Sequence, residues 1–443
     1  MESIFSLFYF PNLAFALFFP FFQILVYSKA IRLKFNFSNP LLISCLFSFP
    51  FLLFTVVLGP YEILTEFYSN SIFHFALGMD NLYAFCRFTS VLFLFALLQK
   101  LKKRVGELPI SKVKKISKTR LRKIGFLFLT TSLILIIFIA RLANKDFFDL
   151  IRDPRDVYQN HRFGVGYLYA LSTSYFLPFG MAFFLCTKPK KLLLMSVFSL
   201  ALFIAHCSGS KGTILQVATS FIIFAFFYRD VKLKLLAVTV AIIAASGMLF
   251  NYSISAGKLN LETVFRYFDY FPNAIRFYRE VFEGKLPHFF GDVFITDFWA
   301  YIPRSLVPEK PSVYGVILVL EHFWPGMAAL GHTPGLTAAV PSYADFGTLG
   351  VIVFGLIDLR NLGLALALTF LKRIDHKSQV FSAPEIVVLT WVFFPTFLGY
   401  FPPGASAIII LLTIVLIPFL NALVGIRVIK NERKKGPTFV EQF

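Results

Sequence analysis

The 443-residue sequence is poor in charged side chains. Asp, Glu, Lys and Arg make up 15% of it, against 57% hydrophobic residues. A soluble globular domain usually has about a quarter charged residues, so this composition argues against one. Cysteine is also scarce: the four cysteines are far apart in sequence (Cys45, Cys86, Cys186 and Cys207). This spacing implies neither a disulfide framework nor a zinc site.

Long apolar stretches fill most of the chain. A stretch of about 17–25 apolar residues crosses a bilayer as a helix, because every backbone N–H and C=O must be satisfied within the segment. We therefore predict an all-α polytopic membrane protein, one integral membrane domain over residues 1–443 with about eleven transmembrane helices. An extra half-span within 313–330 would make twelve. The predicted spans are 4–27, 41–59, 72–99, 124–140, 164–186, 192–207, 213–228, 235–250, 338–358 (running on, tilted or broken, to about 371), 385–400 and 406–426.

The net charge of +19 is explained mainly by topology. Of the 43 Lys and Arg residues, 28 fall in alternate loops, and 11 of these lie in the segment 100–123. By the positive-inside rule these loops are cytoplasmic, and 100–123 is a solvated basic cytoplasmic loop that follows the lipid surface. Anionic lipids are a secondary attraction for this charge, and nucleic acid is not expected as a partner.

One polar segment on the opposite side, residues 251–337, is far larger than the rest. We predict that it is a periplasmic loop region that forms the roof of a cavity. Apolar spacing indicates a helix along the membrane surface over about 261–283. Three prolines between 303 and 311 predict a rigid extended loop over 289–311. In the other outer loop, 141–163, we expect a short amphipathic helix that breaks at Pro154.

Cations on this outer side are candidates for binding an anion, above all a phosphate or diphosphate. Ordinary ion pairing with the outer acidic residues is an equally good explanation for any one of them. Lys211 stands apart, because Ser208-Gly-Ser-Lys-Gly212 joins two apolar spans and would place the ammonium at a helix N-terminus. The outer cations considered are Arg141, Arg152, Arg155, Arg162, Lys211, Arg266, Arg276, Arg279, Arg304 and Lys310.

Three side chains are candidates for a general base. His332 is flanked by Gly and Pro at a span entrance, where an imidazole could take a proton from an attacking hydroxyl. Asp297 and Asp345 compete with it, and Asp345 is near the outer end of a span, where an ionisable group is costly. Asp80 and Arg87 share one face of the span 72–99, either as a buried pair that assists the site or as a device for helix packing. The outer segments contain no Asp-x-Asp pair, so the sequence gives little support for a divalent metal site.

Several of these motifs, in this order, resemble the Wzy-type O-antigen or oligosaccharide repeat-unit polymerases, a GT-C-like group related to the O-antigen ligases. The strongest likeness is in the run Asp297-Phe-Trp-Ala-Tyr-Ile-Pro-Arg-Ser-Leu-Val-Pro-Glu-Lys-Pro311. It is followed by Gly331-His-Thr-Pro-Gly335 and by Tyr343-Ala-Asp-Phe-Gly-Thr-Leu-Gly350. The turn Gly209-Ser-Lys-Gly212 is similar to the family's Gly-Ser-Arg-Gly turn, with Lys in place of Arg.

The resemblance implies a glycosyltransferase of the bacterial inner membrane whose active site faces the periplasm. Such enzymes transfer a growing glycan from undecaprenyl diphosphate onto the next lipid-linked repeat, without metal, nucleotide or other cofactor. Membrane lipids, a flippase and a chain-length regulator are the partners implied. The diphosphate would be held by Arg304, Lys310, Lys211, Arg276 and Arg279, with His332, Asp345 and Asp297 as catalytic candidates and Arg162, Tyr343 and Trp299 as substrate-binding residues.

Two other functions remain open. An O-antigen ligase, which moves the finished glycan to the lipid A core, would need the same kind of cavity. A lipid-linked oligosaccharide flippase or other transporter is the alternative from another class. Transporters usually show repeated halves and polar residues at the membrane midplane, and the sequence shows neither symmetry nor a band of midplane charge.

Overall fold

The structure is a computed structural model. It describes residues 9–32, 70–105, 118–154, 171–185, 189–210, 271–302, 306–326 and 335–371, with shorter pieces at 39, 41–42, 45, 156, 168–169, 187, 213–214, 216–218 and 220–221. Every regular element in these ranges is a helix, so the all-helical prediction is confirmed for the part of the chain that is described.

Within the described residues, four stretches are long and apolar enough to cross a membrane: Pro11–Ile31, Ser71–Leu101, Lys118–Leu142 and Ala339–Thr369. They correspond to α2 (Tyr9–Ile31), α4 (Asn70–Val105), α5 (Lys118–Leu142) and the consecutive helices α17 (Ala339–Ile357) and α18 (Leu359–Leu371). Two shorter apolar helices, Leu171–Leu185 and Lys191–Cys207, match two further predicted spans. The first combines the π-helical η2 (Leu171–Phe176) with α9 (Leu177–Leu185), and the second is α10.

The remaining predicted spans lie wholly or mostly outside the described residues. These are 41–59, 213–228, 235–250, 385–400 and 406–426, so the total of about eleven stays a prediction. The proposed half-span in 313–330 contains α16 (Val316–Phe323). A helix of eight residues is only about 12 Å long and cannot cross the hydrocarbon core. This helix therefore adds no twelfth span.

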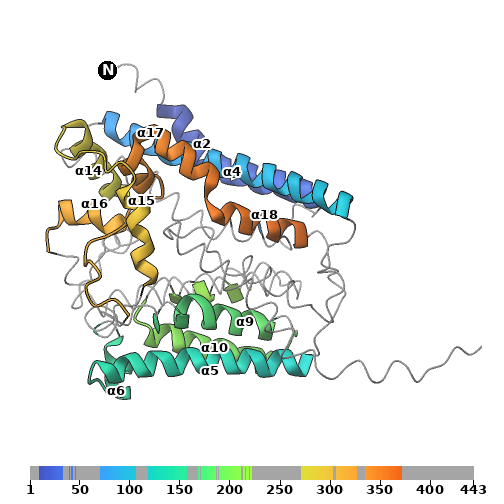
Figure 1. Cartoon of the computed structure of the whole chain (residues 1–443). Helices are drawn as coiled ribbons and strands as arrows, with labels where there is room; N and C mark the ends of the chain where they lie inside the picture. Colours follow the sequence, from blue (N-terminus) through green and yellow to red (C-terminus); the bar gives the residue numbers. More distant parts are fainter. Residues whose placement is uncertain are drawn as a thin grey trace, which may run out of the picture.

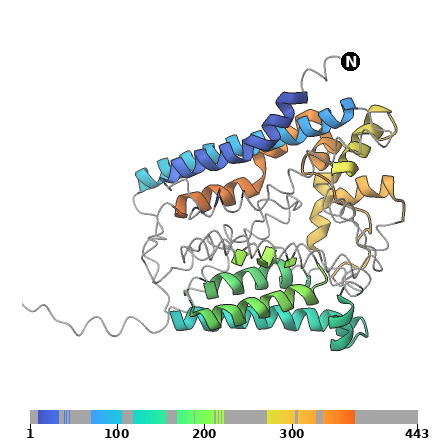
Figure 2. The same cartoon turned by 180° about the vertical axis from the view of Figure 1, so that it is seen from behind.

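The described helices form two layers (Figure 1). α4 packs against α2, α17 and α18 in one layer, whereas α5 packs against η2, α9 and α10 in the other. The view from behind shows the same separation (Figure 2). Within the second layer, α5 and α9 approach closely at two glycines. A Cβ on Gly125 would lie 3.0 Å from the carbonyl oxygen of Gly180 and 2.7 Å from Phe184. Small residues allow such close approach between apolar helices.

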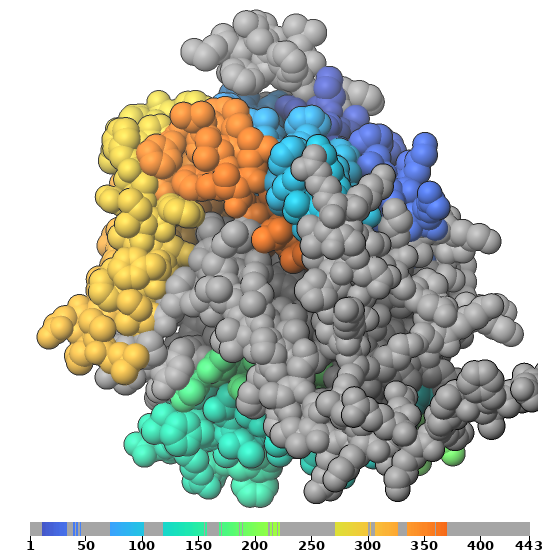
Figure 3. All heavy atoms as spheres, turned by 45° about the vertical axis from the view of Figure 1, so that its right-hand side comes forward, coloured from blue at the N-terminus to red at the C-terminus, as the bar shows by residue number. Residues whose placement is uncertain are grey.

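A group of short helices covers one end of the first layer, and we call it the cap assembly (residues 271–326). It contains α14 (Phe271–Phe282), α15 (Asp292–Thr296), the 3₁₀-helix η3 (Asp297–Tyr301) and α16. Figure 3 shows it beside α17 and on the far side of α17 from α2. The apolar face of α14 packs into the same core as the start of α4, through Ala274, Phe277 and Tyr278.

Two loop predictions can be compared with this structure. α14 confirms the second half of the helix predicted over 261–283, while 261–270 lie outside the described residues. The extended loop predicted over 289–311 is wrong for 292–301, which are helical, because the prolines begin only at 303. At the same end of the molecule, α6 (Phe147–Arg152) is the short helix expected before Pro154, and Asp146 with Asp149 forms a capping box at its start.

Candidate functional site

Asp345 joins the cap assembly to the span that carries it. Its side chain is buried in the first half of α17, just before the kink at Phe346 and Gly347, and both carboxylate oxygens accept backbone hydrogen bonds. Oδ1 accepts from the N–H groups of Gly291 and Val293 at 3.1 and 3.0 Å, and Oδ2 accepts from that of Phe294 at 2.9 Å. These are the free N–H groups at the start of α15, so the carboxylate caps this helix and fixes it against α17.

Asp297 and Trp299 lie in η3, which continues directly from α15. The Asp297 side chain is buried and packs against Gly315, the residue before α16. The Gly315 N–H donates to the Thr296 hydroxyl at 2.8 Å, which ties the start of α16 to the same turn. The half-buried ring of Trp299 lies against that of Phe298, with centroids 4.7 Å apart. Asp345 and Asp297 are thus at opposite ends of α15.

Arg276 is held by aromatic rings. Its guanidinium carbon lies 5.1 Å from the ring centroid of Phe323 and 5.0 Å from that of Trp324, so that α14 is joined to the end of α16 by cation–π contacts. Among the described residues it has no hydrogen-bond or ion-pair partner. The N–H edges of the guanidinium are therefore not engaged there, although its position is fixed.

The other two described members of the predicted diphosphate-binding set, Lys310 and Arg279, have different contacts. Lys310 Nζ donates to the carbonyl oxygen of Ile302 at 3.1 Å and lies 4.6 Å from the ring centroid of Tyr314. Arg279 forms an ion pair with Glu283 at 2.8 Å on the exposed side of α14. Arg276 and Arg279, only three residues apart, consequently have different surroundings: one is on an aromatic platform and the other in an exposed ion pair.

Tyr343 occupies the junction between α17, α4 and α14. Its ring is buried, with centroids 5.0 Å from Tyr278, 5.7 Å from Phe75 and 5.7 Å from His288. The ring thus helps to seat the cap assembly. Four other predicted site residues, His332, Arg304, Lys211 and Arg162, lie outside the described residues, and their roles stay predictions.

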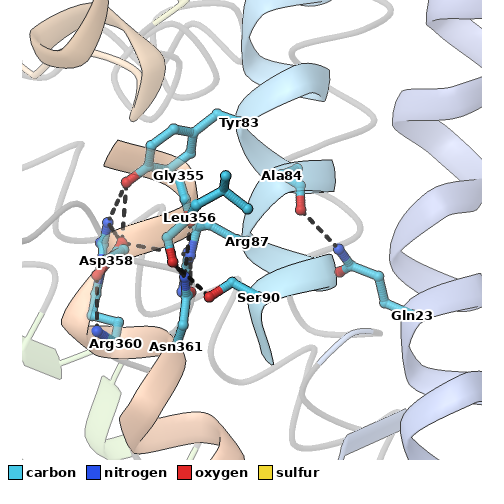
Figure 4. Close-up of polar contacts among 10 residues, drawn as sticks. All are labelled: Gln23, Tyr83, Ala84, Arg87, Ser90, Gly355, Leu356, Asp358, Arg360 and Asn361. Carbon is cyan, nitrogen blue, oxygen red and sulfur yellow. Dashed lines mark hydrogen bonds and ion pairs between the residues drawn. The ribbon is translucent and has the colours of Figure 1, made fainter. Parts of the chain in front are cut away.

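A buried polar network lies deeper in the first layer, where α17 ends and α18 begins (Figure 4). The Asp358 carboxylate accepts from Arg360 Nε at 2.7 Å and from the Tyr83 hydroxyl at 3.0 Å. Arg360 Nη2 also donates to the Tyr83 hydroxyl at 3.0 Å. Arg87 Nε donates to Asn361 Oδ1 at 3.1 Å and lies 3.5 Å from Asp358. Two guanidiniums therefore share one carboxylate at about the middle of α4.

The same network satisfies the backbone at the helix break. Ser90 donates to the carbonyl oxygen of Leu356 at 2.6 Å, and Asn361 donates to that of Gly355 at 2.8 Å. The Asp358 carboxylate accepts the N–H of Arg360 at 2.8 Å, at the start of α18. Unpaired carbonyl and N–H groups inside a bilayer are costly, so these contacts make the interruption tolerable.

Sequence reasoning did not identify this network. The available signal was the polar sequence Asp358-Leu-Arg-Asn361 inside an otherwise apolar run, because ionisable groups within spans are rare. The suggested pairing of Asp80 with Arg87 does not occur. Arg87 turns to Asp358 and Asn361, whereas Asp80 accepts the N–H of Ala339 at 3.2 Å.

No metal-binding group is present among the described residues: nowhere do three His, Cys, Asp or Glu side chains gather in a way that could hold an ion. Three cysteines in these ranges, Cys45, Cys86 and Cys207, are buried, and none of them is in a disulfide.

Among known proteins, this chain matches curated sequences but no family model and no solved structure. The O-antigen polymerases of Salmonella typhimurium and Salmonella typhi are each 26% identical to it over 226 residues, which is 49% of this chain and 53% of theirs. The chain thus spans about half the length of the curated relatives it matches. Together with the apolar helices, these homologues support the placement of the chain in the Wzy-type O-antigen polymerase family.

Proposed function

We propose that this protein polymerises lipid-linked glycan repeats at the periplasmic face of the bacterial inner membrane. It would transfer the growing glycan from polyprenyl diphosphate onto the next polyprenyl-diphosphate-linked unit. The observation that carries the proposal is the similarity to two proteins named O-antigen polymerase. The apolar helices are consistent with a substrate whose lipid part stays in the bilayer.

The proposed reaction exchanges one bond at the anomeric carbon for another. The bond from this carbon to the diphosphate oxygen breaks, and the diphosphate leaves with the electron pair. A hydroxyl of the acceptor sugar forms the new glycosidic bond and loses its proton to a base. The energy comes from the glycosyl–diphosphate bond, so the reaction as proposed consumes no nucleotide. The protein has two tasks: to stabilise charge on the leaving diphosphate and to accept the proton.

Arg276 is the described side chain best suited to the first task. Its guanidinium faces are held by Phe323 and Trp324, and its donors have no partner among the described residues. A guanidinium has five N–H donors in a fixed planar array that matches phosphate oxygens. Because it is already positioned, it would lose little conformational freedom on binding. Lys310, in the same cap assembly, and Arg304 and Lys211, outside the described residues, complete the proposed diphosphate-binding set.

Cells that lack the native gene and carry variants of it would test this assignment. We expect Arg276→Ala to reduce polymer yield about 10²–10³-fold, as is typical for the loss of one such charge-stabilising donor. Arg276→Lys should recover only part of it, since the ammonium keeps the charge but loses the planar array. Arg152→Ala, an exposed cation at the end of α6, is the control. A normal glycan ladder in cells that carry Arg276→Ala would show that Arg276 does not bind the diphosphate.

The product that accumulates distinguishes the possible functions. Loss of a polymerase leaves lipid A core capped by a single repeat. Loss of a ligase leaves bare core and glycan retained on polyprenyl lipid. Purified wild-type protein given synthetic polyprenyl-diphosphate-linked repeats and a chelator should produce a ladder of oligomers. If it produces none, and the deletion strain shows bare core, the proposed polymerase function is wrong.

A further inference from the structure

Asp80 is a described carboxylate next to the cap assembly that keeps an oxygen available. It lies on α4, beside the start of α17, and is partly exposed. Its Oδ1 accepts the N–H of Ala339 at 3.2 Å, and within the described part of the chain Oδ2 accepts no hydrogen bond. Asp345, in contrast, uses both oxygens to cap α15, and Asp297 is buried against Gly315. Asp80 thus combines an oxygen that accepts no hydrogen bond in the described part of the chain with a partly exposed position, whereas Asp345 and Asp297 are buried.

Two hydroxyl groups near Asp80 make no well-formed hydrogen bond to any described residue. The Thr337 hydroxyl is buried beside the Asp80 carboxylate, and it makes no well-formed hydrogen bond within the described part of the chain. Tyr278, on α14, is fully buried and interacts electrostatically with Asp80, and its hydroxyl makes no hydrogen bond to any residue that the structure describes. Burial of the phenol and the nearby Asp80 charge raise the pKa of Tyr278 well above its ordinary value, so this hydroxyl is a proton donor at any physiological pH.

Unpaired buried hydroxyls are costly, and each one in a folded protein calls for an explanation. Here both lie near one carboxylate, next to the edge-to-face rings of Tyr278 and Tyr343. Among the described residues no cation pairs with Asp80: the candidate partner, Arg87, is engaged with Asp358 and Asn361. A carboxylate with two hydroxyls and no cation fits a neutral ligand rich in hydroxyl groups, and does not fit a phosphate.

We propose that Asp80 binds the attacking hydroxyl of the acceptor sugar and takes up its proton, with Tyr278 and Thr337 as hydrogen-bonding neighbours. This inference rests on the proposed polymerase function. The hydroxyl oxygen bonds to the anomeric carbon of the donor, the anomeric carbon–oxygen bond to diphosphate breaks, and the hydroxyl proton moves to Asp80 Oδ2. The diphosphate leaves with the electron pair of the broken bond, and the cations of the site stabilise its negative charge.

Two variants separate this role from a purely structural one. Asp80→Asn removes the basic oxygen, but its amide oxygen can still accept the Ala339 N–H and preserve the start of α17. Tyr278→Phe removes a hydroxyl that makes no hydrogen bond to any described residue, so the variant should fold as stably as wild type or more stably. Asp292→Asn, an exposed aspartate at the start of α15, is the matched charge control.

The experiment measures ladder formation by the purified proteins from synthetic polyprenyl-diphosphate-linked repeats, and the temperature at which each unfolds. We expect Asp80→Asn to unfold near the wild-type temperature and to polymerise about 10²–10⁴-fold more slowly, as for the loss of a general base. Tyr278→Phe should unfold no earlier than wild type and be at least about tenfold slower, in line with the loss of one hydrogen bond to the ligand. Asp292→Asn should match wild type in both measurements.

Wild-type rates for Asp80→Asn would overturn the proposal and leave Asp80 as a cap of α17. If Asp80→Asn does not fold, Tyr278→Phe decides: a wild-type rate again overturns the proposal, and a slow, stable protein supports it. These outcomes all presuppose a wild-type ladder. If wild type forms no ladder and the deletion strain shows bare core, the polymerase function itself is refuted, so the two failures are distinguishable.

Discussion

The Nε atom of Arg87 lies 3.5 Å from Oδ2 of Asp358, which joins the middle of α4 to the break between α17 and α18. Asp358 also pairs with Arg360 at 2.5 Å, and its side chain is only 1% exposed. One carboxylate therefore balances two guanidiniums within a predicted span. Loss of Asp358 should therefore destabilise the fold more than loss of either guanidinium, because it leaves two buried positive charges uncompensated.

We predict that Asp358→Asn lowers the free energy of unfolding by about 3–5 kcal/mol, the usual cost of breaking a buried ion pair. Unfolding in detergent, followed by circular dichroism, would measure it. The double variant Asp358→Asn/Arg360→Gln should recover part of the loss, since it restores the net charge of the cluster. The exposed Asp153→Asn is the control. Equal stability of Asp358→Asn and wild type would show that the network does not hold the helix break.

The close contact between α5 and α9 leads to a second prediction. A Cβ on Gly125 would lie 2.7 Å from Phe184 and 3.0 Å from the Gly180 carbonyl oxygen, so Gly125→Ala must push the helices apart. We expect a loss of about 1–3 kcal/mol, as for overpacking in a core. Gly78→Ala is the matched control, because its added Cβ would meet only Asn12 at 3.6 Å. Unfolding temperatures of the two variants should differ clearly, and similar values would contradict the packing of this layer.

A third prediction concerns pH. Hydrogen bonds from Lys285 and Arg279 hold the pKa of Glu283 below its ordinary value of 4.5. A folded-state pKa that is lowered stabilises the fold above the unfolded value, and this contribution is lost as pH falls through the folded pKa. The end of α14 should therefore fray more at about pH 3 than at about pH 6, which amide hydrogen exchange over 280–286 can measure. Glu283→Gln should abolish this local pH dependence, and its persistence would assign it to another group.

Several features of the fold follow from local sequence patterns. Apolar length indicated α2, α4 and α5, and the carboxylates of Asp146 and Asp149 are a typical start for a short helix such as α6. The proline-based prediction failed over 292–301, because prolines restrict the residues just before and after them and say little about positions further away. Local patterns describe residues that are close in sequence. Predictions based on them are correct where interactions between such residues determine the structure.

The site residues depend on contacts that no local pattern contains. Asp345 was a candidate base because it is ionisable and near a span end, but its hydrogen-bond donors lie 51–54 residues earlier in the chain. Arg276 was one of ten outer cations, and its distinguishing feature is the pair of rings supplied by α16. The pairing of Arg87 with Asp358 likewise joins positions more than 270 residues apart. Charge and position suggested candidates, and the partners became visible only in three dimensions.

The fourth prediction tests the turn that connects Asp297 to α16. Gly315 has a φ of +56°, and a Cβ there would lie 2.7 Å from the Asp297 carboxylate and 3.2 Å from its Cα. Gly315→Ala therefore adds a steric clash to the strain of a left-handed backbone, and we expect it to cost at least about 1–3 kcal/mol in the local fold. Gly326 also has a positive φ, +84°, but open space around its added Cβ. Gly326→Ala thus measures the backbone strain alone, and the difference between the two variants isolates the contact with Asp297. Limited proteolysis within the cap assembly would report the local effect. If both variants are cleaved equally fast, Asp297 does not pack against this glycine, and the arrangement of η3 and α16 must be revised.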